Sequence, residues 1–248
     1  MSAVYVMWHR QLIRYWRSRG RMLGSLGQPL LFLIALGFGL GPIFQRAGQG
    51  NFIDFLVPGV IAMSILFTSM FAGMEVIWDR QFGFLKETLV APVKRSHIML
   101  GKTLGGATVA TAQGIIVFII ALIVGFRPAS ALGLITALIF MFLIAFLFSA
   151  FGVALSSKLE DMQAFPIIMN FLIMPIFFLS GALFPLDSIP NFLKVIAIFD
   201  PLSYGVDGLR GALSGTAHFS FLTSFSVLIV ISLIVLFIGS HLFSKIEA

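Results

Sequence analysis

The sequence of 248 residues contains no cysteine and few charged residues. The absence of cysteine excludes disulfides, thiolate metal sites and cysteine nucleophiles. Asp, Glu, Lys and Arg make up only 10% of the chain, against about 25% in a typical soluble domain. So few charges cannot cover the surface of a water-soluble globule of this size, which excludes an ordinary soluble enzyme and a nucleic-acid-binding domain.

Hydrophobic residues, by contrast, make up 59% of the chain, and the mean hydropathy is +1.05. A membrane-spanning helix needs about 20 mostly apolar residues. Six such windows lie between charged residues, at about 22–44, 55–77, 103–126, 131–157, 164–184 and 219–243. The alternation typical of β-barrel strands is absent. We therefore predict an all-α polytopic membrane protein with a single membrane domain over residues 1–248.

The basic residues indicate the orientation of these spans. With the N-terminus placed inside, 12 of the 16 Lys and Arg residues lie on inside segments and 4 lie outside. This asymmetry fits the positive-inside rule with both termini in the cytoplasm. The net charge of +6 is then explained by topology and requires no nucleic-acid partner.

Ionisable residues are scarce within the predicted spans. Glu75 is the deepest acid, and no Lys or Arg lies in the middle of a span. Ion-coupled carriers usually need buried charges at that depth, so a secondary carrier is disfavoured. The four histidines are scattered, and no catalytic cluster is visible, which disfavours a membrane-bound lipid-modifying enzyme.

The segment 1–21 is predicted to form an amphipathic interfacial helix. Val4, Trp8, Leu12, Tyr15 and Trp16 fall on one face, which we expect to meet the acyl boundary, and the opposite face should meet lipid headgroups. That opposite face carries Arg10, Arg14, Arg17 and Arg21. Two roles remain open, a simple topology anchor and a helix that touches a partner subunit.

The loop 78–102 is too charged to lie in the membrane. Residues 84–90 can form about two helical turns before Pro92, and their apolar side chains would be exposed inside the cell, which suggests an interface. The run 96–103 ends in Gly101-Lys102-Thr103, as a phosphate-binding loop does, but the run lacks the first glycine of such a loop and no strand precedes it. No nucleotide site is therefore predicted in this chain.

The outside segment 185–217 contains an apolar run that is too short to span a membrane. Pro190 and Pro201 suit the first turns of two short helices. Asp207 and Arg210 are three residues apart and can pair on one helix face. The segment could be a structural cap or an external gate. Elsewhere, the glycine spacings 37/41, 101/105 and 211/215 permit close helix packing.

Three sequence runs carry a resemblance to a known family. They are residues 83–92 (GFLKETLVAP), residues 180–185 (SGALFP), and residues 200–204 (DPLSY) continued to Arg210. With six spans in about 250 residues, the chain resembles the membrane subunit of type-2 ABC exporters, the group of daunorubicin-resistance, nodulation-factor and O-antigen permeases. Members of that family often have Asn where Asp200 stands.

The resemblance implies a mechanism and partners. Two copies of the chain would pair, and a homodimer is favoured. The pair would lie in the plasma (inner) membrane of a prokaryote. Each copy would dock an ABC ATPase subunit, and that subunit would bind ATP and Mg²⁺. No cofactor or metal is expected in this chain. The cargo would be a hydrophobic, amphipathic or lipid-linked compound of multidrug or antibiotic type. The alternative is a polysaccharide or glycolipid exporter.

The resemblance also assigns residues to four roles. The coupling helix that contacts the ATPase would be Gly83, Phe84, Leu85, Lys86, Glu87, Thr88 and Leu89. The interfacial helix would act through Trp8, Arg10, Arg14, Trp16 and Arg17. The external gate would use Pro185, Pro201, Tyr204, Asp207 and Arg210. The translocation path would be lined by Phe67, Phe71, Phe171, Met174 and Phe178, although lipid-facing packing also explains such residues.

Overall fold

The computed structural model describes residues 3–46, 51–84, 88, 90, 92–159, 161–185 and 190–244. Within these residues the chain is helical and has no β-strand, which confirms the all-α fold. The helices are α1 (Ala3–Arg17), α2 (Arg19–Arg46), α3 (Phe52–Gln81), α5 (Arg95–Val124), α6 (Ala131–Ser156), α7 (Ala164–Ile168), the π-helical turn η1 (Met169–Ile173), α8 (Met174–Leu179), α9 (Asn191–Phe199), α10 (Pro201–Ser214) and α11 (Phe221–Ser244).

Among the described helices, α2, α3, α5, α6 and α11 are long and apolar enough to cross a membrane. The window 164–184 forms the continuous run α7, η1 and α8, a shorter apolar helix that ends at Leu179. At 1.5 Å per residue this run is about 24 Å long, less than the roughly 30 Å of a hydrocarbon core. A sixth crossing at this segment therefore remains a prediction.

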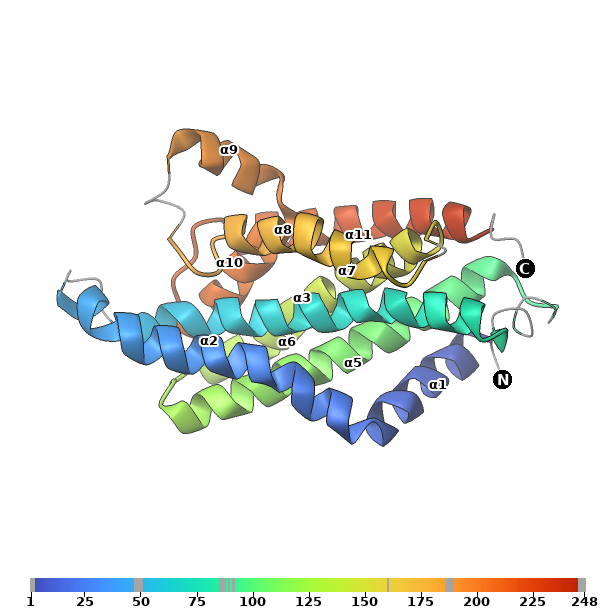
Figure 1. Ribbon diagram of the computed structural model, residues 1–248. Coiled ribbons are helices and arrows are strands. Elements are labelled where there is room, and N and C mark those ends of the chain that lie inside the picture. Colours follow the sequence, from blue (N-terminus) through green and yellow to red (C-terminus); the bar gives the residue numbers. More distant parts are fainter. Residues whose placement is uncertain are drawn as a thin grey trace.

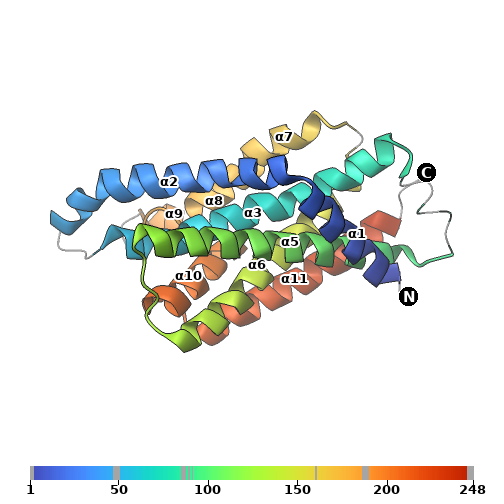
Figure 2. The same ribbon diagram turned by 90° about the horizontal axis from the view of Figure 1, so that it is seen from below.

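The long helices lie roughly alongside one another in an elongated bundle (Figure 1). Helix α1 begins and α11 ends at one end, which we call the α1 end. The short helices α9 and α10 lie at the opposite end, which we call the α10 end. Figure 2 shows α1 crossing the bundle obliquely over α5. Helix α3 packs against α2, α5, α6 and α10, so it forms the centre of the bundle.

The apolar side chains of α3 are buried along most of its length, from Leu56 to Ile77. Two glycines let neighbouring backbones approach this helix closely. A Cβ at Gly73 would lie 2.2 Å from the carbonyl oxygen of Gly152 in α6, and a Cβ at Gly59 would lie 2.1 Å from that of Ala182. Any larger residue at either position would therefore push these segments apart.

Candidate functional site

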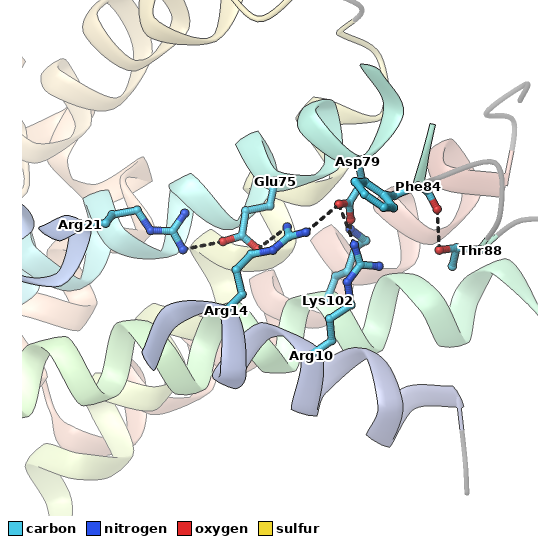
Figure 3. A network of polar contacts seen from close by, with 8 residues as sticks. All are labelled: Arg10, Arg14, Arg21, Glu75, Asp79, Phe84, Thr88 and Lys102. Atoms are coloured by element: carbon cyan, nitrogen blue, oxygen red, sulfur yellow. Dashed lines mark hydrogen bonds and ion pairs between the residues drawn. The ribbon is translucent and has the colours of Figure 1, made fainter. Parts of the chain in front are cut away.

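A cluster of ion pairs lies at the α1 end, centred on two acids of α3 that are one turn apart (Figure 3). Asp79 Oδ1 accepts hydrogen bonds from Arg10 at 2.9 Å and from Arg14 at 3.1 Å. Asp79 Oδ2 accepts one from the Lys102 ammonium at 2.6 Å. The side chains of Asp79 and Lys102 are only 4% and 5% exposed. Asp79 thus binds α1 and α5 to the end of α3.

Glu75 extends the cluster to a further helix. Its Oε1 accepts a hydrogen bond from Arg21 of α2 at 2.7 Å, and its Oε2 lies 3.7 Å from Arg14. Ion pairs therefore connect α1, α2, α3 and α5, which we call the ion-pair cluster (Arg10, Arg14, Arg21, Glu75, Asp79 and Lys102). Buried charges of this kind are stable only when they are paired and hydrogen-bonded.

Two expectations from the sequence are wrong at this cluster. Asp79 was expected in a loop, but α3 continues to Gln81 and holds Asp79 within the helix. Arg10 and Arg14 were expected to face lipid headgroups, but both reach Asp79. The spacing of four between Glu75 and Asp79, matched by the same spacing between Arg10 and Arg14, is the signal that could have found it.

Helix α1 is held against α5 by two glycines of α5. A Cβ at Gly101 would lie 2.6 Å from Met7 Cβ, and a Cβ at Gly105 would lie 2.5 Å from Gln11 Cβ. The glycine spacing 101/105 is therefore used for packing within this chain. The spacing 37/41 is not used in this way, because a Cβ at Gly41 would meet nothing within 4 Å.

Polar contacts add to this packing. Trp8 Nε1 donates a hydrogen bond to Thr108 Oγ1 at 3.0 Å, and the Tyr15 hydroxyl donates one to Gln113 Oε1. Burial raises the pKa of Tyr15. The expectation that Trp8 and Tyr15 face the acyl boundary is wrong, because they pack on α5. Trp16, which is 76% exposed, and Arg17 do point outward.

The segment that follows α3 begins with a turn at Gly83, whose φ of 79° lies in the left-handed region that glycine tolerates. The Arg10 guanidinium lies 5.8 Å from the centre of the Phe84 ring. Thr88 Oγ1 donates a hydrogen bond to the Phe84 carbonyl at 2.9 Å, a helical spacing. Of the predicted coupling residues, Leu85, Lys86, Glu87 and Leu89 lie outside the described residues.

Apolar side chains near this segment are exposed, among them Phe82, Phe84 and Val90. Exposed apolar patches of this kind are typical of interaction surfaces. Since Phe84 also contacts Arg10, the exposed surface is connected to the ion-pair cluster through one side chain.

Two cavities lie beside α2 and α3. The inner cavity, of about 390 Å³, is bounded by α2, α3 and the α7–α8 run, and its lining includes Met63, Phe67, Phe71, Phe165, Met169 and Met174. The α1 cavity, of about 420 Å³, is bounded by α1, α2, α3 and α5, and its lining includes Gln11, Tyr15, Arg21, Phe71, Glu75 and Trp78. Both are of the size that holds small ligands.

Four residues line both cavities and so make them neighbours: Gly24, Ser25, Thr68 and Phe71. Of the predicted path residues, Phe67, Phe71 and Met174 line the inner cavity. Phe171, which is 81% exposed, and Phe178 line neither cavity, and both side chains are exposed at the surface of the chain. The structure thus brings three of the five together.

At the α10 end, Pro201 occupies the first turn of α10, as the sequence predicts. Asp200 caps this helix, because its Oδ1 accepts a hydrogen bond from the Leu202 N–H at 2.8 Å. The Tyr204 hydroxyl donates a hydrogen bond to the Ile198 carbonyl at 2.9 Å, which ties α10 back to α9. Burial raises the pKa of Asp200 to about 7.

The predicted pairing of Asp207 with Arg210 is wrong. Asp207 accepts hydrogen bonds from the backbone N–H groups of His218 and Phe219, at 2.7 and 2.9 Å. Arg210 donates to the Gly181 carbonyl at 2.9 Å, and its guanidinium lies 4.0 Å from the centre of the Phe55 ring. Burial lowers the pKa of Arg210 to about 10, against the opposing effect of the Asp207 carboxylate.

Three of the predicted gate residues, Pro185, Asp207 and Arg210, line a cavity of about 490 Å³ at the α10 end. Pro201 and Tyr204 lie apart from it, in the first turn of α10. Within the described part of the chain, no group of three or more His, Cys, Asp or Glu side chains is arranged to hold a metal ion.

Comparison with known proteins identifies the family. The model of the ABC-2 type transporter family matches residues 2–214. The chain belongs to this family. A putative transport permease ycf38 of Cyanophora paradoxa is 29% identical, with 99% of this chain and 89% of that protein covered. Nodulation protein J of Rhizobium leguminosarum bv. trifolii is 29% identical, with 84% of this chain and 80% of that protein covered.

Permeases of the ABC-2 family work with an ABC ATPase as partner. This membership confirms the resemblance that the sequence runs indicated. An ABC-2 permease must both move a cargo and respond to a partner. The two cavities and the ion-pair cluster can be considered for these two tasks.

Proposed function

We propose that this ABC-2 permease is the membrane subunit of an ATP-driven exporter for a hydrophobic, amphipathic or lipid-linked compound, of the multidrug or antibiotic type. The observation that carries the proposal is the pair of neighbouring, largely apolar cavities beside α2, α3 and α7–α8. Cavities with apolar walls and a few polar groups are what such a cargo requires. Phe67, Phe71 and Met174 would line the path.

In this proposal two copies of the chain form a homodimer in the plasma membrane of a prokaryote. Each copy crosses the membrane six times, with both termini in the cytoplasm, so the α1 end is the cytoplasmic end. An ABC ATPase docks on the segment that begins at Gly83, and that ATPase binds ATP and Mg²⁺. The segment 185–217 forms the external gate.

The ion-pair cluster supports a route for coupling. A displacement of Phe84 by the ATPase would act on Arg10 and, through Asp79, on α3 and α5. Because α3 lines both cavities, a movement of its end would alter the path directly.

A second candidate is a permease for a polysaccharide or a glycolipid. The similarity to nodulation protein J favours it, since nodulation-factor export belongs to the group that the sequence resembles. The two candidates differ in the cargo, and they share the path and the coupling.

Reconstitution with the ABC ATPase encoded beside the gene would test the proposal. ATP-dependent uptake of a fluorescent amphiphile into inside-out vesicles is expected. Phe84→Ala should lower the rate at least about tenfold, because the contact through which a displacement by the ATPase reaches Arg10 would be lost. Phe82→Ala is the matched control, since Phe82 is exposed nearby and has no described contact with Arg10. Uptake driven by a proton or sodium gradient without ATP would contradict the proposal.

A further inference from the structure

Helix α1 has a second apolar face, which the described part of the chain leaves uncovered. Its buried residues, Gln11 and Tyr15, lie on the side that packs on α5. The other side exposes four large apolar side chains: Tyr5, Val6, Ile13 and Trp16. Trp16 is the most exposed of them, at 76%. An exposed row of this kind indicates a contact outside the chain.

The arginines of this region fall into two groups. Three of them belong to the ion-pair cluster, where the acids of α3 satisfy them. The other two, Arg17 and Arg19, are exposed, and their side chains have no ion pair or hydrogen bond among the described residues. They flank Ser18, the residue between α1 and α2. We call residues 16–19 the elbow. It carries two positive charges that no described acid neutralises.

The elbow lies where the chain enters the bilayer. Helix α2 is long and apolar enough to cross a membrane, and no charged residue lies between Arg21 and Arg46. Basic residues at the start of such a span lie at the level of the lipid headgroups, and Trp is enriched at the same level. The junction of α1 and α2 also lies at the outer edge of the bundle (Figure 1). The elbow therefore meets lipid headgroups.

The two unpaired guanidinium groups select the charge of the headgroup. A guanidinium group binds a phosphate through two parallel hydrogen bonds. In phosphatidylcholine the phosphate is already compensated by the ammonium of its own headgroup. In an anionic lipid such as phosphatidylglycerol no such cation is present, so the phosphate is neutralised by Arg17 and Arg19. Each basic residue near an anionic leaflet raises the affinity about fivefold.

We infer that the elbow binds an anionic phospholipid of the leaflet at the α1 end. Arg17 and Arg19 bind its phosphate, and the Trp16 ring lies beside the upper part of an acyl chain. The lipid then holds the junction of α1 and α2 from outside, while the ion-pair cluster holds it from inside. The inference concerns the membrane and does not rest on the proposed function, because it involves neither cargo nor ATP.

Quenching of tryptophan fluorescence by brominated lipids would test this site. The full chain is placed in phosphatidylcholine nanodiscs in which a small fraction of the lipid is brominated near the top of its acyl chains. The brominated lipid is either phosphatidylglycerol or phosphatidylcholine. The part of the signal that Trp16→Phe removes belongs to Trp16. Phosphatidylglycerol should quench this part at least about fivefold more than phosphatidylcholine does.

The double variant Arg17→Gln with Arg19→Gln should bring this quenching ratio close to one, because both guanidinium groups are lost. Both positions are exposed, so the melting temperature should be unchanged. Lys158→Gln with Lys194→Gln is the matched control. It removes the same net charge at two positions far from the elbow in the sequence, and it should leave the ratio as in the wild type. An equal fall in both double variants would show an effect of overall charge and would overturn the site.

A further measurement uses the wild-type protein and so does not depend on the folding of a variant. Raising the salt concentration from about 0.1 M to about 1 M shortens the Debye length from about 10 Å to about 3 Å, so the ratio should fall. Adding glycerol phosphate at low salt should leave it unchanged. Displacement by glycerol phosphate would show a site for a free anion, and a wild-type ratio near one would show no preference. Either result would overturn the inference, and neither bears on the exporter proposal.

Discussion

The two ends of the bundle both bury charged side chains, but they satisfy them differently. At the α1 end, Asp79 is paired with side chains from two other helices, α1 and α5. At the α10 end, Asp200 and Asp207 bind backbone N–H groups, and Arg210 binds a backbone carbonyl. Side chains that pair across helices can exchange partners when a helix moves, whereas charges bound to the backbone hold a local segment in one shape.

This difference suggests that the two ends of the bundle respond differently to a displacement of a helix. The α1 end can transmit a displacement, because a few ion pairs join four helices there. The α10 end should resist such a displacement, because each charged side chain there holds a turn or the start of a helix in place. Substitutions at the two ends should therefore differ in size and in kind.

The largest effect is expected from Asp79→Ala. It leaves the Lys102 ammonium buried without its nearest partner, and breaking a buried pair in this way costs about 3–5 kcal/mol. Thermal unfolding of the purified protein would measure the loss. The double variant Asp79→Asn with Lys102→Met should recover much of it, and Asp161→Ala, at an exposed position, should have little effect. Similar melting temperatures for Asp79→Ala and wild type would contradict the role of the cluster.

The second-largest loss of stability is expected from a substitution where α1 packs on α5. Gly101→Ala introduces a Cβ that would lie 2.6 Å from Met7 Cβ, and such overpacking costs about 1–3 kcal/mol. Helix α1 should move away from α5, which limited proteolysis of α1 would detect. Gly39→Ala is the control, since a Cβ there meets nothing within 4 Å. If both variants are cleaved at the wild-type rate, the glycine contact has no role in holding α1.

At the α10 end, Asp200→Ala should cost about 1 kcal/mol through loss of the helix cap, and Asp200→Asn should keep the cap. The pKa of Asp200 is raised from 3.8 to about 7 by burial, so the folded protein retains a proton that the unfolded chain has lost. Stability should therefore fall as the pH rises from about 4 to about 7. Melting curves across that range should show a weaker fall for Asp200→Asn, and identical curves would contradict this assignment.

The smallest effect is expected from Trp8→Phe, which removes the hydrogen bond to Thr108 and keeps most of the apolar contact. A single bond of this kind contributes about 0.5–1.5 kcal/mol. A double-mutant cycle with Thr108→Val would isolate it by thermal unfolding. Trp16→Phe is the control and should leave the stability unchanged, because Trp16 is exposed. A coupling energy of zero between Trp8 and Thr108 would show that the hydrogen bond is not formed in the membrane.

Much of the fold could be predicted from the sequence, because apolar length and charge position determine where a helix can enter a bilayer. The helical character of all six windows, the amphipathic helix α1 and the start of α10 at Pro201 follow from such local rules. The family could also be identified, because its marker runs are local.

The contacts between helices could not be predicted in the same way. Periodicity shows that Trp8 and Tyr15 share one face of α1, but it does not show whether lipid or α5 covers that face. Asp207 and Arg210 have the right spacing for a pair, yet distant backbone groups compete for both side chains. The three predicted path residues that line a cavity differ from Phe171 and Phe178 only in the neighbours that the bundle brings to them.

The π-helical turn η1 has a consequence for which side of its segment faces inward. Phe165, Met169, Ile173 and Phe177 follow one another at intervals of four and are all buried. In a regular α-helix, twelve residues at about 100° each would rotate the last of these side chains about 120° away from the first. A π turn adds one residue to its loop and takes back about 100° of that rotation. The turn therefore keeps a single row of side chains pointed inward along the whole segment. Deleting one residue from the turn would restore a regular α-helix and leave Phe177 within about 20° of its inward direction, whereas a regular α-helix with all twelve residues would turn it out of the core.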